Sequence, residues 1–285
     1  MDGFDFISAV DLDDALSILA REAGNACPVA GGTNVVVKAQ SGKLKDKLLV
    51  GIDRIEALSV IRKENGLITI GALTTLSEIA GSALLKEEAS VLWQAAQVFA
   101  DPVIRNRATV GGTIADASPT ADTAPALLVL QAEVLVRGLR GERNIPIDDF
   151  FYNVCKTALE YDELIVAVRF RPCRTGAFVK LGLRNTMAKT LISAAAIVHL
   201  DQAGAVEACT IAMGSVAPRP TRARYAEQAI TGKALTEETY ALLKEAVLQD
   251  IDPIESIRAS KFYRSNVACT IAERAVRNAA SLEQS

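Results

Sequence analysis

Two glycine pairs constrain the fold of this chain more than any other feature of its sequence. The first pair sits in a segment made of Val29, Ala30, Gly31, Gly32, Thr33, Asn34 and Val35. The second sits in a segment made of Thr109, Val110, Gly111, Gly112 and Thr113. Because glycine has no Cβ, its backbone N–H can approach a ligand closely, and successive N–H groups before a helix form an anion site. The same pattern also fits a plain tight turn followed by a helix N-cap.

The two pairs together indicate a nucleotide diphosphate held from opposite sides. They lie 80 positions apart, counted from Gly31 to Gly111. A Rossmann site would need G-x-G-x-x-G after a strand, which does not occur. A P-loop fails as well, because Gly42-Lys43 is followed by Leu44 and Gly232-Lys233 by Ala234. The sequence therefore predicts a different kind of diphosphate site, in which backbone N–H groups supply most of the affinity.

Length and composition bound the remaining classes of protein. A chain of 285 residues predicts two domains or subdomains, and 50% apolar with 23% charged residues is typical of a globular protein. A net charge of −3 without a basic stripe argues against nucleic acid as a partner. No apolar run reaches the roughly 20 residues of a membrane span. The acidic N-terminus is unlike a secretory signal, so we expect a cytoplasmic protein.

Cysteine and histidine usage argues against metal chemistry by this chain alone. The five cysteines are widely spaced, and no C-x-x-C occurs. The single histidine, His199, ends an apolar run and fits a core or edge position. We therefore expect no metal site and no catalytic acid or base among these residues.

Local patterns predict alternating helices and strands. Residues 58–62 and 67–71 read as a hairpin around Asn65-Gly66, and the capping-box pattern from Thr75 to Glu78 predicts a helix start. Residues 138–144 read as a polar turn. The Pro, Gly and charge of residues 171–176 predict a domain boundary.

Several longer motifs resemble those of one known family, the FAD-binding subunits of molybdenum hydroxylases, which include the flavin subunits of carbon monoxide, xanthine and nicotinate dehydrogenases. The resemblance covers nearly the whole chain. It is carried by D-P-x-I-R-N-x-A-T-V-G-G at 101–112, A-S-P-x-x-D at 117–122, A-G-G-T at 30–33, I-G-A-x-x-T at 70–75, D-E-L-I at 162–165, G-S-V-A-P-R-P-T-R-A at 214–223 and R-A-S-x-x-Y-R at 258–264.

The resemblance implies a fold and a domain order. The fold is α+β: an FAD-binding domain of the p-cresol methylhydroxylase (vanillyl-alcohol oxidase) type, built of two α/β subdomains, and a smaller α+β C-terminal domain. On this basis the FAD domain spans residues 1–173, split near residue 55, and the C-terminal domain spans residues 174–285.

The resemblance also implies roles for individual residues. The two glycine segments would hold the FAD diphosphate, and Asp122 would accept hydrogen bonds from the sugar-alcohol chain or ribose, although it also fits a helix N-cap. Phe99 matches a position against the flavin ring, or else closes its helix as a core aromatic. Ile165 borders the flavin in the family but also fits an ordinary strand core. Lys180 matches a lysine near the isoalloxazine, where a cation favours the reduced anionic flavin, but it also fits a solvated strand lysine.

The expected function is that of an FAD-carrying electron-transfer subunit. In such complexes a partner subunit holds molybdopterin and another holds [2Fe–2S] clusters, and electrons pass through FAD to NAD or another acceptor. A self-contained flavin oxidase and a scaffold that has lost FAD remain as alternatives. Two departures stand out: Thr113 replaces the family's usual Asn, and the cysteine-rich insert of benzoyl-CoA-reductase-type relatives is absent.

Overall fold

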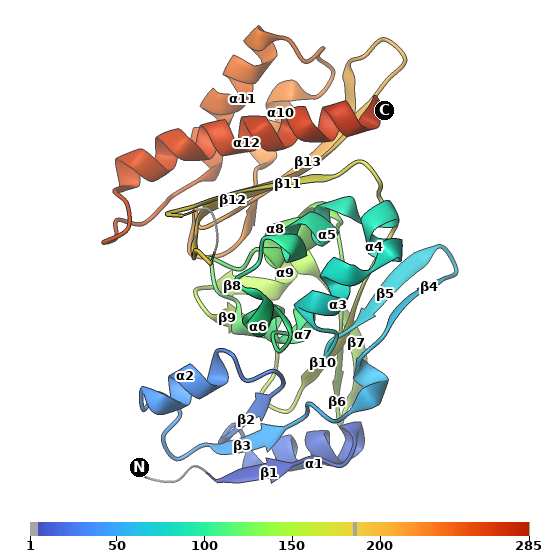
Figure 1. The fold of residues 1–285 in the computed structure, drawn as a ribbon, viewed down its shortest axis with the longest axis vertical. Coiled ribbons are helices and arrows are strands. Elements are labelled where there is room, and N and C mark those ends of the chain that lie inside the picture. Colours follow the sequence, from blue (N-terminus) through green and yellow to red (C-terminus); the bar gives the residue numbers. More distant parts are fainter. Residues whose placement is uncertain (1–4, 185–186, 285) are drawn as a thin grey trace.

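The computed structural model describes residues 5–184 and 187–284, and it stacks three sheet-containing parts along the long axis of the molecule (Figure 1). The first part is a parallel three-stranded sheet with strand order β1-β3-β2. Helix α1 buries Leu16 and Leu19 against it and is capped by the Asp11 side chain. Its elements are β1 (Phe6–Ser8), α1 (Leu12–Glu22), β2 (Ala26–Val29), α2 (Val35–Gln40) and β3 (Leu48–Gly51).

The middle part is an antiparallel five-stranded sheet, β4-β5-β10-β6-β7, with short helices packed against it. Its strands are β4 (Ile61–Glu64), β5 (Leu67–Gly71), β6 (Glu133–Gly138), β7 (Gly141–Pro146) and β10 (Leu164–Phe170), and β8 (Phe151–Asn153) pairs with β9 (Lys156–Thr157). Its helices are η1 (Glu56–Leu58), α3 (Leu76–Gly81), α4 (Ala83–Glu88), α5 (Ser90–Gln97), α6 (Pro102–Arg105), α7 (Val110–Asp116), α8 (Thr123–Val129) and α9 (Ile147–Phe150). The largest apolar cluster of the molecule fills this part.

The third part is an antiparallel sheet, β11-β12-β13-β14, covered on one face by helices. Ala195 and Ile197 of β12 belong to the core of the middle part, whereas Ala194 and Ala196 pack in the core beneath α12. This two-sided burial explains why β12 is apolar without alternation. The elements are β11 (Ala177–Gly182), β12 (Thr190–Leu200), β13 (Val206–Gly214), β14 (Thr221–Arg222), α10 (Arg224–Ile230), α11 (Glu237–Asp250) and α12 (Lys261–Glu283).

Two local predictions are confirmed, and one is wrong. Strands β4 and β5 form a hairpin whose turn residues Asn65 and Gly66 both have positive φ. Thr75 and Glu78 form a full capping box. The predicted polar turn at 138–144 is instead largely strand β7, which pairs with β6. It is an edge strand with residues 141–144 exposed, so it lacks the apolar alternation that identifies a strand in sequence.

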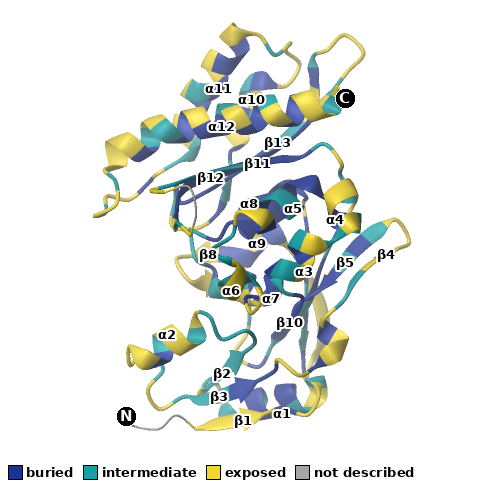
Figure 2. Cartoon of the chain, in the orientation of Figure 1, coloured by how far each residue is buried: buried dark blue, intermediate teal, exposed yellow. Residues whose placement is uncertain are grey.

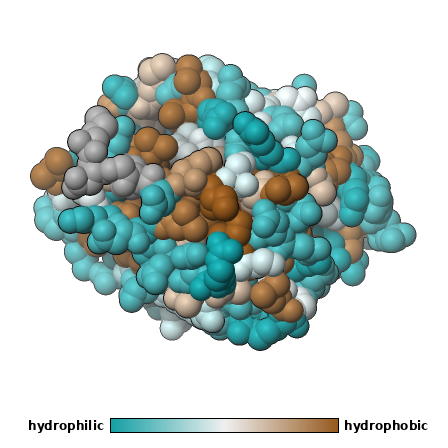
Figure 3. Space-filling model, turned by 90° about the horizontal axis from the view of Figure 1, so that it is seen from below, coloured by the Kyte–Doolittle hydropathy of each residue, from teal (hydrophilic) through white to brown (hydrophobic). Residues whose placement is uncertain are grey.

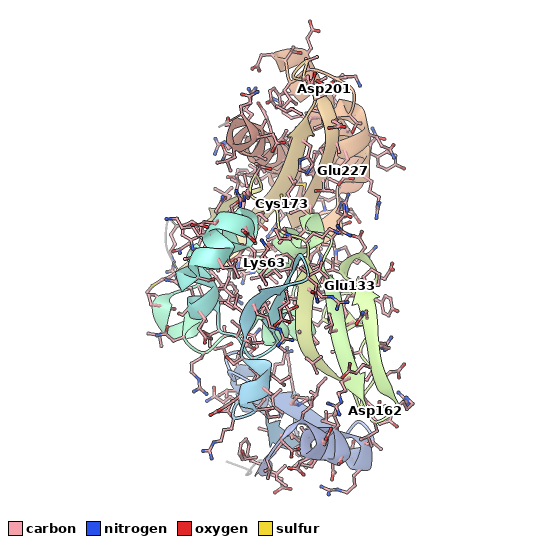
Figure 4. All side chains as sticks on the ribbon, turned by 90° about the vertical axis from the view of Figure 1, so that its right-hand side faces the viewer. Lys63, Glu133, Asp162, Cys173, Asp201 and Glu227 are labelled. Carbon is pink, nitrogen blue, oxygen red and sulfur yellow. The ribbon has the colours of Figure 1, made fainter. Side chains whose placement is uncertain are left out.

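Many of the buried residues lie at the contact between the middle part and the third part. In Figure 2 the buried residues concentrate where α5 and α8 meet β11 and β12. Figure 4 shows Cys173 between these two parts, with Glu133 on the five-stranded sheet and Glu227 on the third part. Within residues 5–184 and 187–284, no helix is long and apolar enough to cross a membrane.

Candidate cofactor-binding site

One cavity of about 810 Å³ is lined by residues from all three parts of the molecule. Pockets for cofactors and drug-sized ligands generally measure roughly 300–1,000 Å³. Of the residues expected at a flavin site, the cavity is lined by Ala30, Gly31, Gly32, Thr33, Asn34, Val35, Phe99, Thr109, Gly111, Gly112, Thr113, Asp122, Ile165 and Lys180. Val29 lies behind Gly32 on β2, and Val110 is fully buried in the middle core. The fold therefore brings both glycine segments, far apart in sequence, to one cavity.

The first glycine segment is a true loop between β2 and α2. Gly32 has a φ of +74°, a backbone conformation that side chains with a Cβ rarely adopt. At Gly31 an added Cβ would lie 1.6 Å from the carbonyl oxygen of Arg107. Glycine is therefore needed at position 31 because the backbone there contacts the backbone at Arg107. It is favoured at position 32 because the chain turns there with a positive φ.

The second glycine segment is the first turn of helix α7 and not a loop. The Thr109 hydroxyl caps the helix by accepting from the N–H of Gly112 at 3.1 Å. A Cβ on Gly111 would lie 2.6 Å from Cβ of Ala72, whereas one on Gly112 would approach only the Thr109 hydroxyl, at 2.9 Å. The Thr113 hydroxyl donates to the Thr109 carbonyl at 2.9 Å, so this hydroxyl is already engaged within the helix.

Asp116, at the end of α7, connects the two glycine segments across the cavity. Its carboxylate accepts from Asn34 Nδ2 at 2.8 Å and pairs with Lys38 Nζ at 2.6 Å. Asn34 therefore does not cap α2, although its position in sequence suggested a cap. Sequence reasoning missed Lys38 and Asp116. The four-residue spacing of Asn34 and Lys38 puts both on one face of α2, but nothing in the sequence pairs that face with Asp116.

At the other end of the cavity a buried ion pair joins the middle part to the C-terminal sheet. Asp122 Oδ2 lies 2.7 Å from Lys180 Nζ, and the Thr190 hydroxyl donates to Asp122 Oδ1. Lys180 also donates to the Val98 carbonyl at 3.1 Å. Burial raises the pKa of Asp122, and the Lys180 ammonium and the Thr190 hydrogen bond oppose that rise.

This pair resolves two of the alternatives left by the sequence. Asp122 occupies the N-cap position of α8, as its place in sequence suggested, but within the described residues its side chain makes no capping bond and is directed to Lys180 and Thr190 instead. Lys180, whose side chain is 11% exposed, is not a solvated strand lysine. Thr190 was not singled out from sequence, because a threonine at a strand start carries no distinguishing signal.

Phe99 and Ile165 each pack in the core and also line the cavity. Ile165 of β10 is 6% exposed and belongs to the middle core, yet it borders the cavity. Phe99, just after α5, packs against the same core while lining the cavity. Together with Lys180 they give the cavity an apolar wall beside a buried ammonium, which suits a flat aromatic ring.

The fold and the two-segment cavity define a class of FAD-binding proteins, and comparison with known proteins agrees. Residues 2–171 match the family described as the FAD binding domain in molybdopterin dehydrogenase. Residues 177–279 match the CO dehydrogenase flavoprotein C-terminal domain. The chain belongs to this family of FAD-binding oxidoreductase subunits of molybdenum hydroxylases.

Individual relatives match along almost their full length. The xanthine dehydrogenase FAD-binding subunit of Escherichia coli O157:H7 is 33% identical, with 97% of each chain covered. The carbon monoxide dehydrogenase medium chain of Hydrogenophaga pseudoflava is 28% identical, with 96% of each covered. A solved carbon monoxide dehydrogenase from the same organism superposes with a TM-score of 0.94, at 28% identity and with 98% of each chain covered. The α+β architecture expected from the sequence is thereby confirmed.

The cavity itself fits an FAD. Its two glycine segments line it with backbone, which suits a diphosphate, and elsewhere Phe99 and Ile165 line it together with the Lys180 ammonium, which suits an isoalloxazine. In the described part of the chain no three His, Cys, Asp or Glu side chains are grouped to hold a metal ion.

Proposed function

We propose that this chain holds FAD along the cavity, with the diphosphate between the two glycine segments. The observation that carries this proposal is that Gly32 and Gly112, distant in sequence, line one cavity. The N-terminus of α7 and the loop before α2 supply N–H groups, and the helix dipole favours an anion there. Residues Ala30–Asn34 and Thr109–Thr113 would make the diphosphate contacts, with Val29, Val35 and Val110 supporting them.

The isoalloxazine would lie at the opposite end, bordered by Phe99, Ile165 and Lys180. Asp122 would orient Lys180 through their 2.7 Å ion pair and accept hydrogen bonds from the sugar-alcohol chain. Bound FAD supplies the hydride and electron transfer, and the protein binds it, orients it and adjusts its electrostatics. A cation at this end would favour the reduced, anionic ring.

We further propose that the chain relays electrons within a complex. An iron–sulfur partner would deliver electrons to the flavin, a molybdenum partner would oxidise the substrate, and NAD or another acceptor would take the electrons. The names of the relatives support this, since they include a carbon monoxide dehydrogenase medium chain and a 6-hydroxypseudooxynicotine dehydrogenase complex subunit. Exposed apolar side chains such as Ile254, Ile257 and Phe262 are also consistent with a docking partner. Apolar residues likewise gather on the face seen from below (Figure 3).

The domain limits and the compartment belong to the same proposal. The FAD domain would span residues 1–173, divided near 55, and the C-terminal domain residues 174–285. A separate apolar cluster beneath α12 supports the second boundary, while Phe178, Ala195, Ile197 and Ala212 extend the middle core across it. A cytoplasmic location is supported by the five cysteines, all described and all free.

Flavin titration of the purified chain tests the first proposal. We expect FAD to bind and to give a yellow protein, and FMN to bind far more weakly because it lacks the second phosphate and the adenosine. Binding of neither flavin would contradict the proposal.

The matched variant is Asp116→Asn, which keeps the size of the side chain but weakens its bonds to Lys38 and Asn34. It should release FAD faster while leaving the far end of the cavity unchanged.

Purification from the native host, with metal analysis, tests the second proposal. Two further subunits should accompany the chain, one with iron and one with molybdenum. A self-contained flavin oxidase would instead purify alone and oxidise a substrate unaided.

A further inference from the structure

Arg264 is a buried cation that the proposed function leaves unexplained. It lies in the first turn of α12 and is 4% exposed. No carboxylate among the described residues comes within ion-pair distance of it, and burial lowers its pKa. The helix dipole opposes a cation at this end, and a buried charge is costly unless hydrogen bonds compensate it. The fold therefore tolerates an unfavourable group at this position.

The contacts of Arg264 join the start of β12, the strand on which Thr190 lines the cavity, to the end of the neighbouring strand β13. One terminal nitrogen donates to the Leu191 carbonyl at 2.7 Å and the Ser215 carbonyl at 3.5 Å. The other donates to Ser256 Oγ at 3.1 Å. Its Nε has no hydrogen-bond partner within the described chain. Arg264 thus fixes the start of β12 to the residue that follows β13.

The start of β12 and Ser215, which Arg264 joins, are hydrogen-bonded to the residues around the buried Asp122–Lys180 ion pair. Thr190, which precedes Leu191, lines the cavity and donates to Asp122. Ser215 donates its hydroxyl to the Thr190 carbonyl at 3.3 Å and its N–H to the Pro119 carbonyl at 2.8 Å. Arg264 therefore holds Thr190 indirectly, through the Leu191 carbonyl next to it in sequence and through Ser215, whose hydroxyl binds the Thr190 carbonyl. Thr190 in turn orients the carboxylate that binds Lys180.

A second buried arginine of the same domain shows the contrast. Arg222, on β14, is paired in a bidentate manner with Glu227, with N–O distances of 2.7 and 2.9 Å. Its charge is neutralised, and its contacts explain a structural role. Arg264 has only carbonyl and hydroxyl partners; these do not line the cavity themselves, but Leu191 directly follows Thr190, which does.

We propose that Arg264 is a positioning residue for the flavin site: by fixing Thr190 and Ser215 it orients Asp122 and so holds the Lys180 ammonium at the isoalloxazine end. This inference rests on the proposed FAD binding. Loss of Arg264 lets Thr190 and Asp122 move, so Lys180 favours the reduced flavin less. The consequence is a change in the ratio of affinities for reduced and oxidised FAD, not only a loss of stability.

The test compares Arg264→Met, Arg264→Lys and the control Arg222→Met in the full chain. We measure FAD affinity by titration, the midpoint potential of the bound flavin, and thermal unfolding without FAD. Arg264→Met should weaken binding of oxidised FAD about tenfold and of reduced FAD about a hundredfold. The tenfold change in their ratio lowers the potential of this two-electron couple by about 30 mV. Arg264→Lys should restore part of the shift, because it keeps one donor. Arg222→Met should lower the unfolding temperature and leave the potential unchanged.

The possible outcomes distinguish failure of the positioning role of Arg264 from failure of the proposed FAD binding. A parent chain that binds no FAD overturns both. A parent that binds FAD, with Arg264→Met folded and unchanged in affinity and potential, overturns the positioning role alone. Equal shifts in Arg222→Met overturn it too, because they mark a general effect of destabilisation. If Arg264→Met fails to fold, Thr190→Val provides the test, because it removes the hydroxyl bonded to Asp122 but keeps Arg264. An unchanged flavin potential in Thr190→Val overturns the proposal that contacts from Arg264 through Thr190 and Asp122 position Lys180.

Discussion

The two glycine segments share a sequence pattern, Gly-Gly-Thr after an apolar residue, but the structure uses their glycines differently. In the first segment Gly32 provides a positive φ and Gly31 allows backbone contact with Arg107. In the second, Gly111 packs against Ala72 inside a helical turn, and Gly112 has open space beyond its cap. One motif thus meets two different physical requirements, conformation and close packing, and Gly112 is left free for the proposed access of a ligand.

The largest effect should come from Gly31→Ala. Its Cβ would lie 1.6 Å from the Arg107 oxygen, so the loop before α2 must separate from the segment before α7. We expect a loss of at least about 3 kcal/mol of unfolding free energy, together with loss of FAD binding. Urea unfolding beside FAD titration measures both. A variant of parental stability would show that the two segments do not need this contact.

Gly32→Val should lower the free energy of unfolding less than Gly31→Ala does, but it should weaken FAD binding as much. Its φ of +74° strains a branched residue by roughly 1–3 kcal/mol. The added side chain also blocks the N–H groups, so we expect FAD affinity to fall by two or more orders of magnitude while circular dichroism keeps most of its signal. Gly32→Ala is the matched control, with the strain but less obstruction. Equal affinities of the two variants would contradict the role of access.

Thr109→Ala tests whether the second segment depends on its helix cap. Removing the hydroxyl that accepts from Gly112 should cost about 1 kcal/mol, the usual value for an N-cap. Asn34→Ala is the control, because Asn34 makes no cap bond to α2 and instead reaches Asp116. It should leave α2 helical and speed FAD release. The comparison fails if the two substitutions have the same effects in thermal unfolding and in the FAD dissociation rate.

The smallest effect on stability should come from Gly112→Ala. Its Cβ approaches only the Thr109 hydroxyl, whose displacement costs no more than the helix cap of about 1 kcal/mol, and alanine favours a helix by up to about 1 kcal/mol over glycine. We expect an unfolding free energy within about 1 kcal/mol of the parent. Gly112→Val should keep the fold and lose FAD, since its larger side chain meets the ligand. Parental FAD affinity in Gly112→Val would exclude this turn from the diphosphate site.

Much of the fold was predictable because its signals are local. The Asn65-Gly66 turn and the Thr75 capping box depend on neighbours in sequence, and each lies where expected. Strand β7 was missed because residues 141–144 are exposed at a sheet edge, where solvent imposes no pattern. Short-range physics therefore determined the elements but not every pairing between them.

The sequence by itself determined that Gly31, Gly32, Gly111 and Gly112 could approach a diphosphate closely, because the absence of a Cβ belongs to the residue type and does not depend on the fold. Only the tertiary structure decided what each glycine is for, since Arg107 and Ala72 come near them through folding. The same holds for the partners of the buried charges. Lys180 meets Asp122 across 58 residues of chain, and Arg264 meets Leu191 across 73. Contacts between distant segments depend on how whole sheets pack, which no local pattern encodes.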